Sequence, residues 1–359
     1  MSDRVKSSWK PGLLLAALCA AAAAPAATHS ETYGYFGEPL RNVSVSDWSD
    51  FQVGLREFSH VWTAEDGVGE RYNEHSCIGC HAIPMPGGSG ITSHTFVWFS
   101  PYIHDDEGGH AFRRLRRSQA GEIELQPPPG ATRRKAPILF GLGLLEAVPV
   151  ELLAEKRVGP DHVNGRFGGR SSVIGRFGWK ASAPGIQDFV RAAIGTELGV
   201  DSNSPIRGKV LTESIAKIVS FVRLLGPPPS RRANSQEELA AANLFHDIGC
   251  SQCHRESLIT QSTEGNSFQI FPYTDLLLHD MGPDRSDKII EGNALGSDFR
   301  TAPLWGLQSS GPPYMHDGAA RDIAEAIELH DGEARASRFR WDALSHSQQE
   351  RLIGFLRAL

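Results

Sequence analysis

The chain has 359 residues, of which 40% are hydrophobic and 22% charged, and its formal net charge is −6 at pH 7. This length and composition are those of a folded globular protein with room for two or three compact units, and they exclude wholesale disorder. Beyond a short arginine cluster at residues 113–117 there is no long basic run, which argues against nucleic-acid binding.

Residues 1–27 have the pattern of a secretory signal peptide. A basic start is followed by an apolar stretch at residues 13–18 and an alanine-rich stretch at residues 20–27 that is typical of a cleavage region. We therefore expect export to the periplasm, with no membrane span after cleavage. A retained membrane helix and a lipoprotein anchored at Cys19 are the alternatives.

Hydrophobic periodicity predicts four helices before residue 226. They cover residues 51–62, 138–148, 186–193 and 212–225, and the last ends sharply at Gly226 and three prolines. Between them, residues 84–90 are too rich in proline and glycine for regular structure. No alternating β pattern of any length is present.

The motif Cys-x-x-Cys-His occurs twice, at Cys77–His81 and Cys250–His254. In this motif two thiols attach covalently to a haem, and the histidine supplies the proximal nitrogen to iron. The two copies predict two covalently bound haem c groups, attached through Cys77, Cys80, Cys250 and Cys253 and ligated by His81 and His254. Zinc sites and disulfides are the alternatives for paired cysteines, but neither requires the histidine that follows each pair.

A proline-rich linker at residues 227–234 divides the mature chain into segments 28–226 and 235–359. The second segment opens with a capping-box pair, Ser235 and Glu238, and closes with a helix that a second such pair, Ser347 and Glu350, is expected to start. Each segment contains one haem motif. The prediction is two mainly α-helical haem units with long irregular loops.

The sequence resembles the bacterial di-haem oxidoreductases related to cytochrome c peroxidases, a family also labelled thiol oxidoreductases. The resemblance covers nearly all of the mature chain. Besides the haem motifs it rests on Phe140-Gly-Leu-Gly-Leu-Leu145, Phe177-Gly-Trp-Lys-Ala181, Asp275-Leu-Leu-Leu-His-Asp-Met-Gly282, Phe299-Arg-Thr-Ala-Pro-Leu-Trp-Gly306, His316-Asp-Gly318 and residues 325–334. It implies that both units are cytochrome-c-like domains, the N-terminal one with insertions, and that their haems exchange electrons.

The proximal histidine leaves the sixth coordination position of the second iron to be assigned. The candidate ligands nearby in the sequence are His279, Met281, Met315, His316 and His330. If residues 321–330 are helical, Ile323, Ile327 and His330 share one face. The resemblance also places the distal ligand, usually methionine, fourteen residues after His316, where this chain has His330. We therefore predict a bis-histidine second haem of lowered potential, because methionine ligation raises it. A packing histidine beside the Asp331-Gly332 turn is the alternative.

By the same resemblance His316 lies between the haems and shapes the catalytic site without binding iron; the alternative is a histidine held by turn hydrogen bonds. For the first iron, His94 is closest to the place where relatives have a detachable distal histidine, although the spacing here is shorter. An open or water-bound iron is the alternative. Trp98, Trp179 and Trp305 could conduct electrons or could simply pack the haem pockets.

These expectations combine into a periplasmic di-haem oxidoreductase. The C-terminal haem accepts electrons from a small donor protein, a cytochrome or cupredoxin, and relays them to the N-terminal haem, which reduces peroxide or a similar small oxidant. Sequence spacing identifies no acid–base residue. A homodimer is one possible oligomeric state. The alternatives are a pure electron carrier, an oxidase of an organic or thiol substrate, and a structural or signalling haem module.

Overall fold

The computed structural model describes residues 37–41, 43–90, 92, 95–103, 110–153, 166–170, 173–200, 208–228, 235–261 and 267–359. In this part of the chain 39% of the residues are helical and 18% lie in strands. The fold is therefore mixed, and the prediction of a mainly helical protein is confirmed only in part. The strands escaped prediction because each has only two to four residues, too few for an alternating pattern to be recognised.

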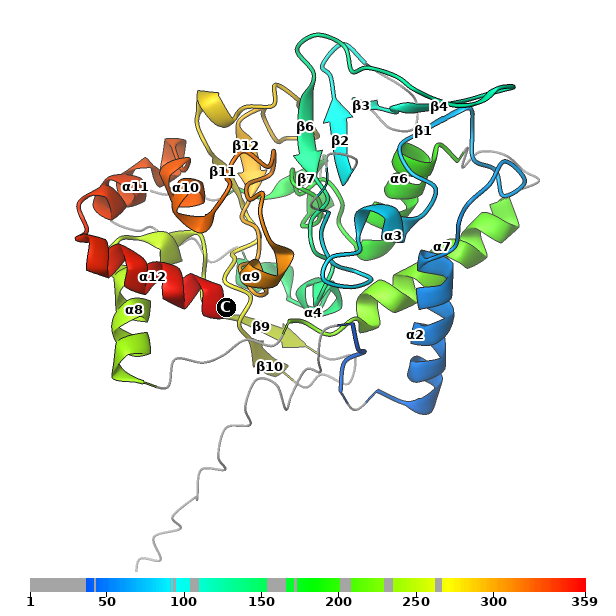
Figure 1. Ribbon diagram of the computed structural model, residues 1–359. Helices are drawn as coiled ribbons and strands as arrows, with labels where there is room; N and C mark the ends of the chain where they lie inside the picture. The colour runs from blue at the N-terminus through cyan, green and yellow to red at the C-terminus, as the bar shows by residue number, and fades with distance from the viewer. Residues whose placement is uncertain are drawn as a thin grey trace, which may run out of the picture.

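The first half is built on helices that Figure 1 draws from blue to green. They are α2 (Val45–Phe58), α3 (Cys77–Cys80), α4 (Leu142–Glu146), α5 (Val150–Leu153), α6 (Ile186–Leu198) and α7 (Gly208–Leu224). Its strands form three small antiparallel sheets: β1 (Arg71–Tyr72), β4 (Leu115–Ser118) and β5 (Gly121–Glu124); β3 (Ala111–Phe112), β2 (Phe96–Phe99) and β6 (Thr132–Lys135); β7 (Gly168–Arg170) and β8 (Val173–Gly175).

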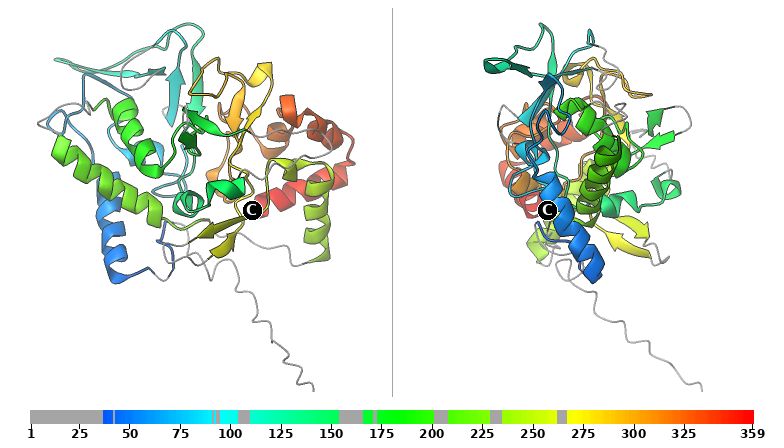
Figure 2. Two further views of the ribbon diagram at one scale, coloured as in Figure 1. Left: turned by 180° about the vertical axis from the view of Figure 1, so that it is seen from behind. Right: turned by 90° about the vertical axis from the view of Figure 1, so that its right-hand side faces the viewer.

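The second half has the helices α8 (Gln236–Asp247), α9 (Leu307–Ser310), α10 (Ile323–Glu328), α11 (Arg335–Asp342) and α12 (His346–Ala358), with the short 3₁₀ turns η2 (Cys250–Gln252), η3 (Pro283–Arg285) and η4 (Gly332–Ala334). Its strands form two antiparallel hairpins, β9 (Leu258–Gln261) with β10 (Ser267–Ile270) and β11 (Leu278–Asp280) with β12 (Asp298–Arg300). Figures 1 and 2 place α2 and α7 at one end of the molecule and α8 and α12 at the other.

Capping residues set several helix starts. The predicted capping box of Ser235 and Glu238 is confirmed at the start of α8. The last helix, however, begins earlier than predicted, because its box is made by Ser345 and Gln348 rather than by Ser347 and Glu350. None of the described helices is long and apolar enough to cross a membrane.

The two halves repeat one arrangement around a short helix. In each half a left-handed glycine, Gly141 (φ 72°) or Gly306 (φ 69°), is the N-cap of α4 or α9. The N–H of Gly141 donates to the carbonyl of Leu225 at the end of α7 (3.1 Å), and that of Gly306 donates to the carbonyl of Leu359 at the end of α12 (2.9 Å). The short helix thus docks on the last helix of its own half in the same way twice.

The same repeat continues in the next loop. Phe177 pairs with Ala183 through a bridge in the first half, as Tyr314 pairs with Ala320 in the second. Each loop has positive φ angles at its second and fifth residues, namely Gly178 and Ala181 or Met315 and Gly318. The loops then lead into α6 and α10. Trp179 and His316 therefore occupy equivalent positions, and α6 is the counterpart of α10.

Among the described residues, the two larger hydrophobic cores match the two ends of the molecule. The first is centred on α2, α6 and α7, and it also takes in Leu258, Ile270, Leu276 and Trp305 from beyond the predicted linker. The second is centred on α8 and α12. The division into segments 28–226 and 235–359 stays a prediction, and most of the linker, residues 229–234, lies outside the described residues.

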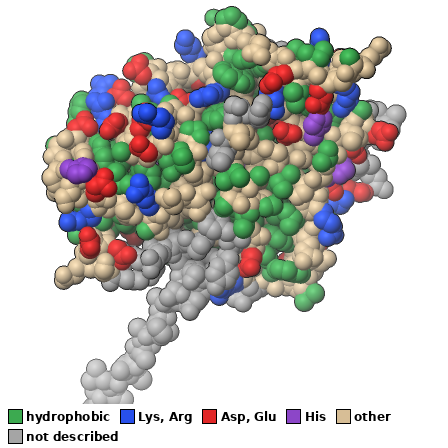
Figure 3. All heavy atoms as spheres, viewed as in Figure 1, with side chains coloured by type: hydrophobic (Ala, Val, Ile, Leu, Met, Phe, Trp, Pro, Cys, Tyr) green, Lys and Arg blue, Asp and Glu red, His purple; other side chains and the backbone are tan. Residues whose placement is uncertain are grey.

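On the face shown in Figure 3, acidic and basic side chains are interspersed, with no large patch of a single sign.

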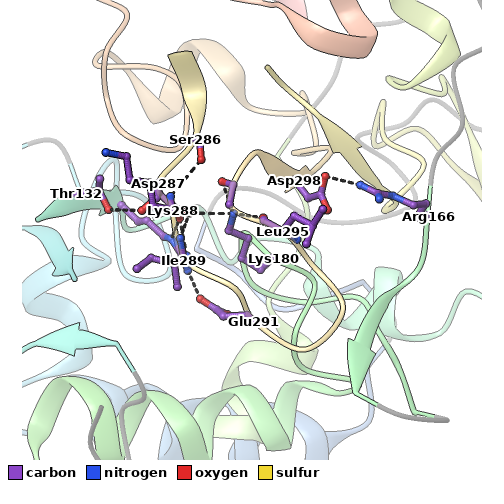
Figure 4. A network of polar contacts seen from close by, with 12 residues as sticks. Thr132, Arg166, Lys180, Ser286, Asp287, Lys288, Ile289, Glu291, Leu295 and Asp298 are labelled. Atoms are coloured by element: carbon purple, nitrogen blue, oxygen red, sulfur yellow. Dashed lines mark hydrogen bonds and ion pairs between the residues drawn. The ribbon is translucent and has the colours of Figure 1, made fainter. Parts of the chain in front are cut away.

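A buried ionic network joins the loop at residues 283–298 to the first half (Figure 4). Asp287, 2% exposed, accepts from Nε of Arg134 (2.8 Å) and pairs with Nζ of Lys180 (3.1 Å). Arg134 also pairs with Glu291, and Lys180 donates to the carbonyls of Leu295 and Gly296. Because charges this deeply buried require partners, the network fixes the loop against the first half.

Replacing Asp287 by Ala is expected to lower the free energy of unfolding by about 3–5 kcal/mol, because Arg134 and Lys180 would be left buried without their shared anion. Urea denaturation of the haem-loaded protein measures the loss. Asp284→Ala, an exposed change in the same loop, is the control and should be nearly neutral. Equal stability of the two variants would show that the network does not hold the loop.

Candidate haem-binding sites

The second haem motif follows α8 and lines a cavity of about 260 Å³. Gly249 ends the helix in a left-handed conformation (φ 91°), and the turn η2 then carries Cys250 and brings the N–H of His254 to the carbonyl of Cys250 (2.9 Å). Cys250, Cys253 and His254 all line the cavity, and so does His330. Side chains from both ends of the second half thus face one space.

His330 lies opposite His254. Their ring centroids are 6.4 Å apart and the ring planes are inclined by 57°. Two metal–nitrogen bonds of about 2 Å each, with half an imidazole ring on either side, span roughly 6 Å. The separation therefore fits one iron held between the two rings. The predicted helix before His330 is confirmed as α10, although it ends at Glu328.

The hydrogen bonds of three histidines prepare them as ligands. Nδ1 of His254 donates to the carbonyl of Tyr273 (3.1 Å), Nδ1 of His330 to that of Ala326 (2.6 Å), and Nδ1 of His81 to that of Gly88 (3.1 Å). Each bond leaves Nε2 for a metal, as is usual for ligating histidines. Burial lowers the pKa of all three, that of His254 to about 4, so the rings are neutral.

Of the other candidates for the sixth position, His279 has no free nitrogen. Its Nε2 bonds to Asp275 and its Nδ1 to Glu333, both at 2.9 Å. Burial alone would lower the pKa of His279, but these carboxylates help raise it to about 12, so the ring is a cation. Met281 and Met315 also line the cavity.

His316 lies where the two halves meet. Its ring stacks on Phe299 (centroids 3.5 Å apart, planes inclined by 18°) and meets the edge of Trp179 at 6.2 Å. Burial, with the nearby cations Arg134 and Lys180, holds the pKa of His316 well below its usual value. The predicted position of His316 between the haems and its role in catalysis both stay predictions. Trp305 is fully buried in the first core.

The first motif forms the short helix α3. Ser76 caps the helix by accepting from the N–H of Gly79 (3.2 Å), and Phe58 of α2 packs at 6.3 Å from the ring of His81. His94, the predicted sixth ligand of this iron, lies outside the described residues. Its assignment stays a prediction.

The alternatives for the cysteines find no support in the described part of the chain. All four motif cysteines lack a disulfide there, and no group of three or more metal-binding side chains is found among the described residues. Burial raises the pKa of Cys77 and Cys250 to about 12.

The internal repeat identifies the first-half counterpart of His330. His330 follows His316 by fourteen residues, and Ala193 follows Trp179 by the same number, on α6. On that helix Ile186, Val190 and Ala193 share one face, as Ile323, Ile327 and His330 do in the second half. A methyl group therefore stands where the second half has an imidazole.

Glu197 lies one turn beyond Ala193 on the same face of α6. Its carboxylate accepts from Nδ2 of Asn73 (2.9 Å), and its carbonyl accepts from the N–H of Asn73 (2.7 Å), four residues before the first haem motif. Burial raises the pKa of Glu197 to about 7, and its charge in turn helps raise the pKa of Cys80. This carboxyl group was missed in the sequence, although the periodicity of residues 186–197 could have placed it on the inward face.

Residues 208–359 match the family described as "Di-haem oxidoreductase, putative peroxidase". Comparison with curated proteins finds no match. Among solved structures, a xenon-pressurised hydrazine synthase of Kuenenia stuttgartiensis is similar at 16% identity, over 98% of this chain and 100% of that one, with a TM-score of 0.42. The diheme peroxidase BthA of Burkholderia thailandensis is similar at 14% identity, over 87% and 86%, with a TM-score of 0.44. Over residues 208–359 the family match confirms the predicted resemblance to the di-haem oxidoreductases.

Proposed function

We propose that the protein is a periplasmic di-haem c-type oxidoreductase that reduces peroxide or a similar small oxidant at its N-terminal haem. The observation that carries this proposal is the inequality of the two repeated halves. His330 faces His254 at 6.4 Å in the second half, whereas Ala193 holds the equivalent position in the first. His254 and His330 would together hold an iron that serves electron transfer, whereas His81 would hold an iron whose remaining position is open to a small molecule.

Two haem c groups, one in each cytochrome-c-like half, supply the redox chemistry. Cys77, Cys80, Cys250 and Cys253 would attach them, and His81, His254 and His330 would ligate the irons. A small cytochrome or cupredoxin would donate electrons to the second haem. The contact of His316 with Trp179 supports transfer between the halves, because aromatic groups from both meet there. The signal-like N-terminus supports the periplasmic location.

Glu197 is the acid–base group in this proposal. Reduction of hydrogen peroxide to two water molecules consumes two electrons and two protons, and breaking the O–O bond requires one proton to move from one oxygen to the other, which leaves. The carboxylate of Glu197 would accept the first proton and return it to the leaving oxygen. A pKa of about 7 suits this exchange, because an acid–base catalyst works best near its own pKa.

Carbon monoxide binding to the purified holoprotein tests the proposal. The half-reduced and fully reduced protein should bind one equivalent, at the first haem, and electron paramagnetic resonance of the oxidised protein should show one bis-histidine low-spin centre. Steady-state turnover with peroxide and a reduced cytochrome completes the test. If neither haem binds carbon monoxide in either state, the protein is an electron carrier and the peroxidase proposal fails.

Replacing His330 by Met should raise the midpoint potential of the second haem by on the order of 0.1 V or more, within the ~0.8 V range that axial ligands span. Potentiometry followed by visible absorption measures the shift. Replacement of His279 by Gln, in the same cavity but without a free ligand nitrogen, should leave the low-spin signal of that haem intact. An unchanged signal in His330→Met would remove His330 from the ligand set.

A further inference from the structure

Arg300 is a buried cation without an anionic partner. It is 7% exposed and lines the cavity of the second haem motif. Its Nε donates to the carbonyl of Gly178 (2.9 Å) and its Nη1 to that of Thr301 (3.3 Å). Among the described residues no carboxylate forms an ion pair with it. Asp275 influences Arg300 through its charge but is paired with His279.

The equivalent arginine of the first half is fully paired. Both halves contain Arg-x-Ala-Pro, at Arg134–Pro137 and at Arg300–Pro303, just before the short helix that docks on the last helix. Arg134 is neutralised by Asp287 and Glu291. Arg300, in the same place of the repeat, faces the cavity and has only carbonyl acceptors.

The cavity as a whole has a surplus of positive charge. Lys135, Arg300 and Arg338 line it, against the single carboxylate of Glu333, which His279 engages. Lys135 is held by three carbonyls, with that of Pro313 closest at 2.8 Å. Burial lowers the pKa of Lys135 to about 8 and that of Arg300 to about 10, and only for Arg300 does a carboxylate, Asp275, offset part of the loss of water. A buried unpaired charge costs several kcal/mol, so the site is built for an incoming anion.

We propose that Arg300 binds a propionate carboxylate of the second haem, with Lys135 as the second positive charge beside it. This inference rests on the proposed function, which puts a haem in this cavity. A haem has anionic groups only at its two propionates, and a guanidinium pairs with a carboxylate through two parallel hydrogen bonds. Because the N–H of Arg300 donates to the carbonyl of Trp179 (2.8 Å), the propionate edge would face the first half.

Arg300→Leu, Arg300→Lys and Arg338→Leu variants of the holoprotein test the assignment. Removal of the cation should lower the midpoint potential of the bis-histidine haem, because a nearby positive charge favours the reduced iron. Arg300→Lys should retain most of the wild-type value. Arg338 lines the same cavity and serves as the matched control, so Arg338→Leu should shift the potential less than Arg300→Leu.

Infrared redox difference spectra of protein carrying haem labelled with ¹³C at the propionates provide a direct readout. The labelled carboxylate bands should shift in Arg300→Leu, and they should shift by a smaller amount in Arg300→Lys. A haem-loaded Arg300→Leu protein with unchanged bands and potential overturns the assignment, as does a larger effect of Arg338→Leu. If Arg300→Leu does not fold, the Arg300→Lys variant alone tests the assignment. An ion pair between Arg300 and a propionate requires the propionate carboxylate bands to shift when an ammonium replaces the guanidinium. Absence of haem from the wild-type protein, measured by the pyridine haemochrome, would instead contradict the proposed function.

Discussion

Replacing Glu197 by Gln is expected to slow peroxide reduction by about 10²–10⁴-fold, the usual contribution of a positioned acid–base group. Glutamine has the same shape as the Glu197 side chain and can still accept the hydrogen bond from Asn73, but it cannot take up a proton. Steady-state turnover at saturating donor measures the loss. Haem content and the low-spin signal of the second haem should remain those of the wild type.

The pH dependence of the wild type gives a second test of Glu197. Burial raises the pKa of Glu197 to about 7, and the ionised form must accept the first proton. The rate at limiting peroxide should therefore fall as the pH drops below about 7 and level off above it. This fall in rate at low pH, the acidic limb of the pH profile, should be missing from Glu197→Gln. Asp188→Asn, an exposed change on the same helix, is the control and should keep both the rate and the limb. Full activity in Glu197→Gln would exclude the proposed role.

The haem attachment sites and the ligand pair of the second iron follow from local sequence patterns alone, and both stay predictions. Cysteine spacing is local, and the two motifs form short turns whose geometry five residues define. His330 could also be predicted, because it follows the end of α10 by two residues and helical periodicity places it on the same face as Ile323 and Ile327. The structure adds the opposing ring of His254, which no local pattern could supply.

The internal repeat and the contacts between the halves could not be predicted from local patterns. The equivalence of Trp179 and His316 depends on backbone angles in two loops with few matching side chains. The partners of Asp287 lie more than a hundred residues away, at Lys180 and Arg134. The raised pKa of Glu197 likewise results from burial, which only the tertiary fold creates.

The repeat also yields the most direct test of which iron is open. Introducing histidine at Ala193 should give the first iron a sixth ligand, as His330 is proposed to do for the second. The two positions are equivalent, because Ala193 follows Trp179 and His330 follows His316 by fourteen residues each. The oxidised variant should show two bis-histidine low-spin centres, and carbon monoxide binding should be lost. Peroxide reduction should fall by about two orders of magnitude or more, since direct contact of substrate with a metal is worth several kcal/mol.

Ala192→His is the matched control for this gain of a ligand. Ala192 is the preceding residue on α6 and is exposed, so a histidine there points about 100° away from the inward face. That variant should keep the open iron and its activity. If Ala193→His instead retains a high-spin first haem that binds carbon monoxide, then the face of α6 does not border the distal side. The open position would then have to be explained by the loop that contains His94, and the inequality of the halves would no longer identify the catalytic iron.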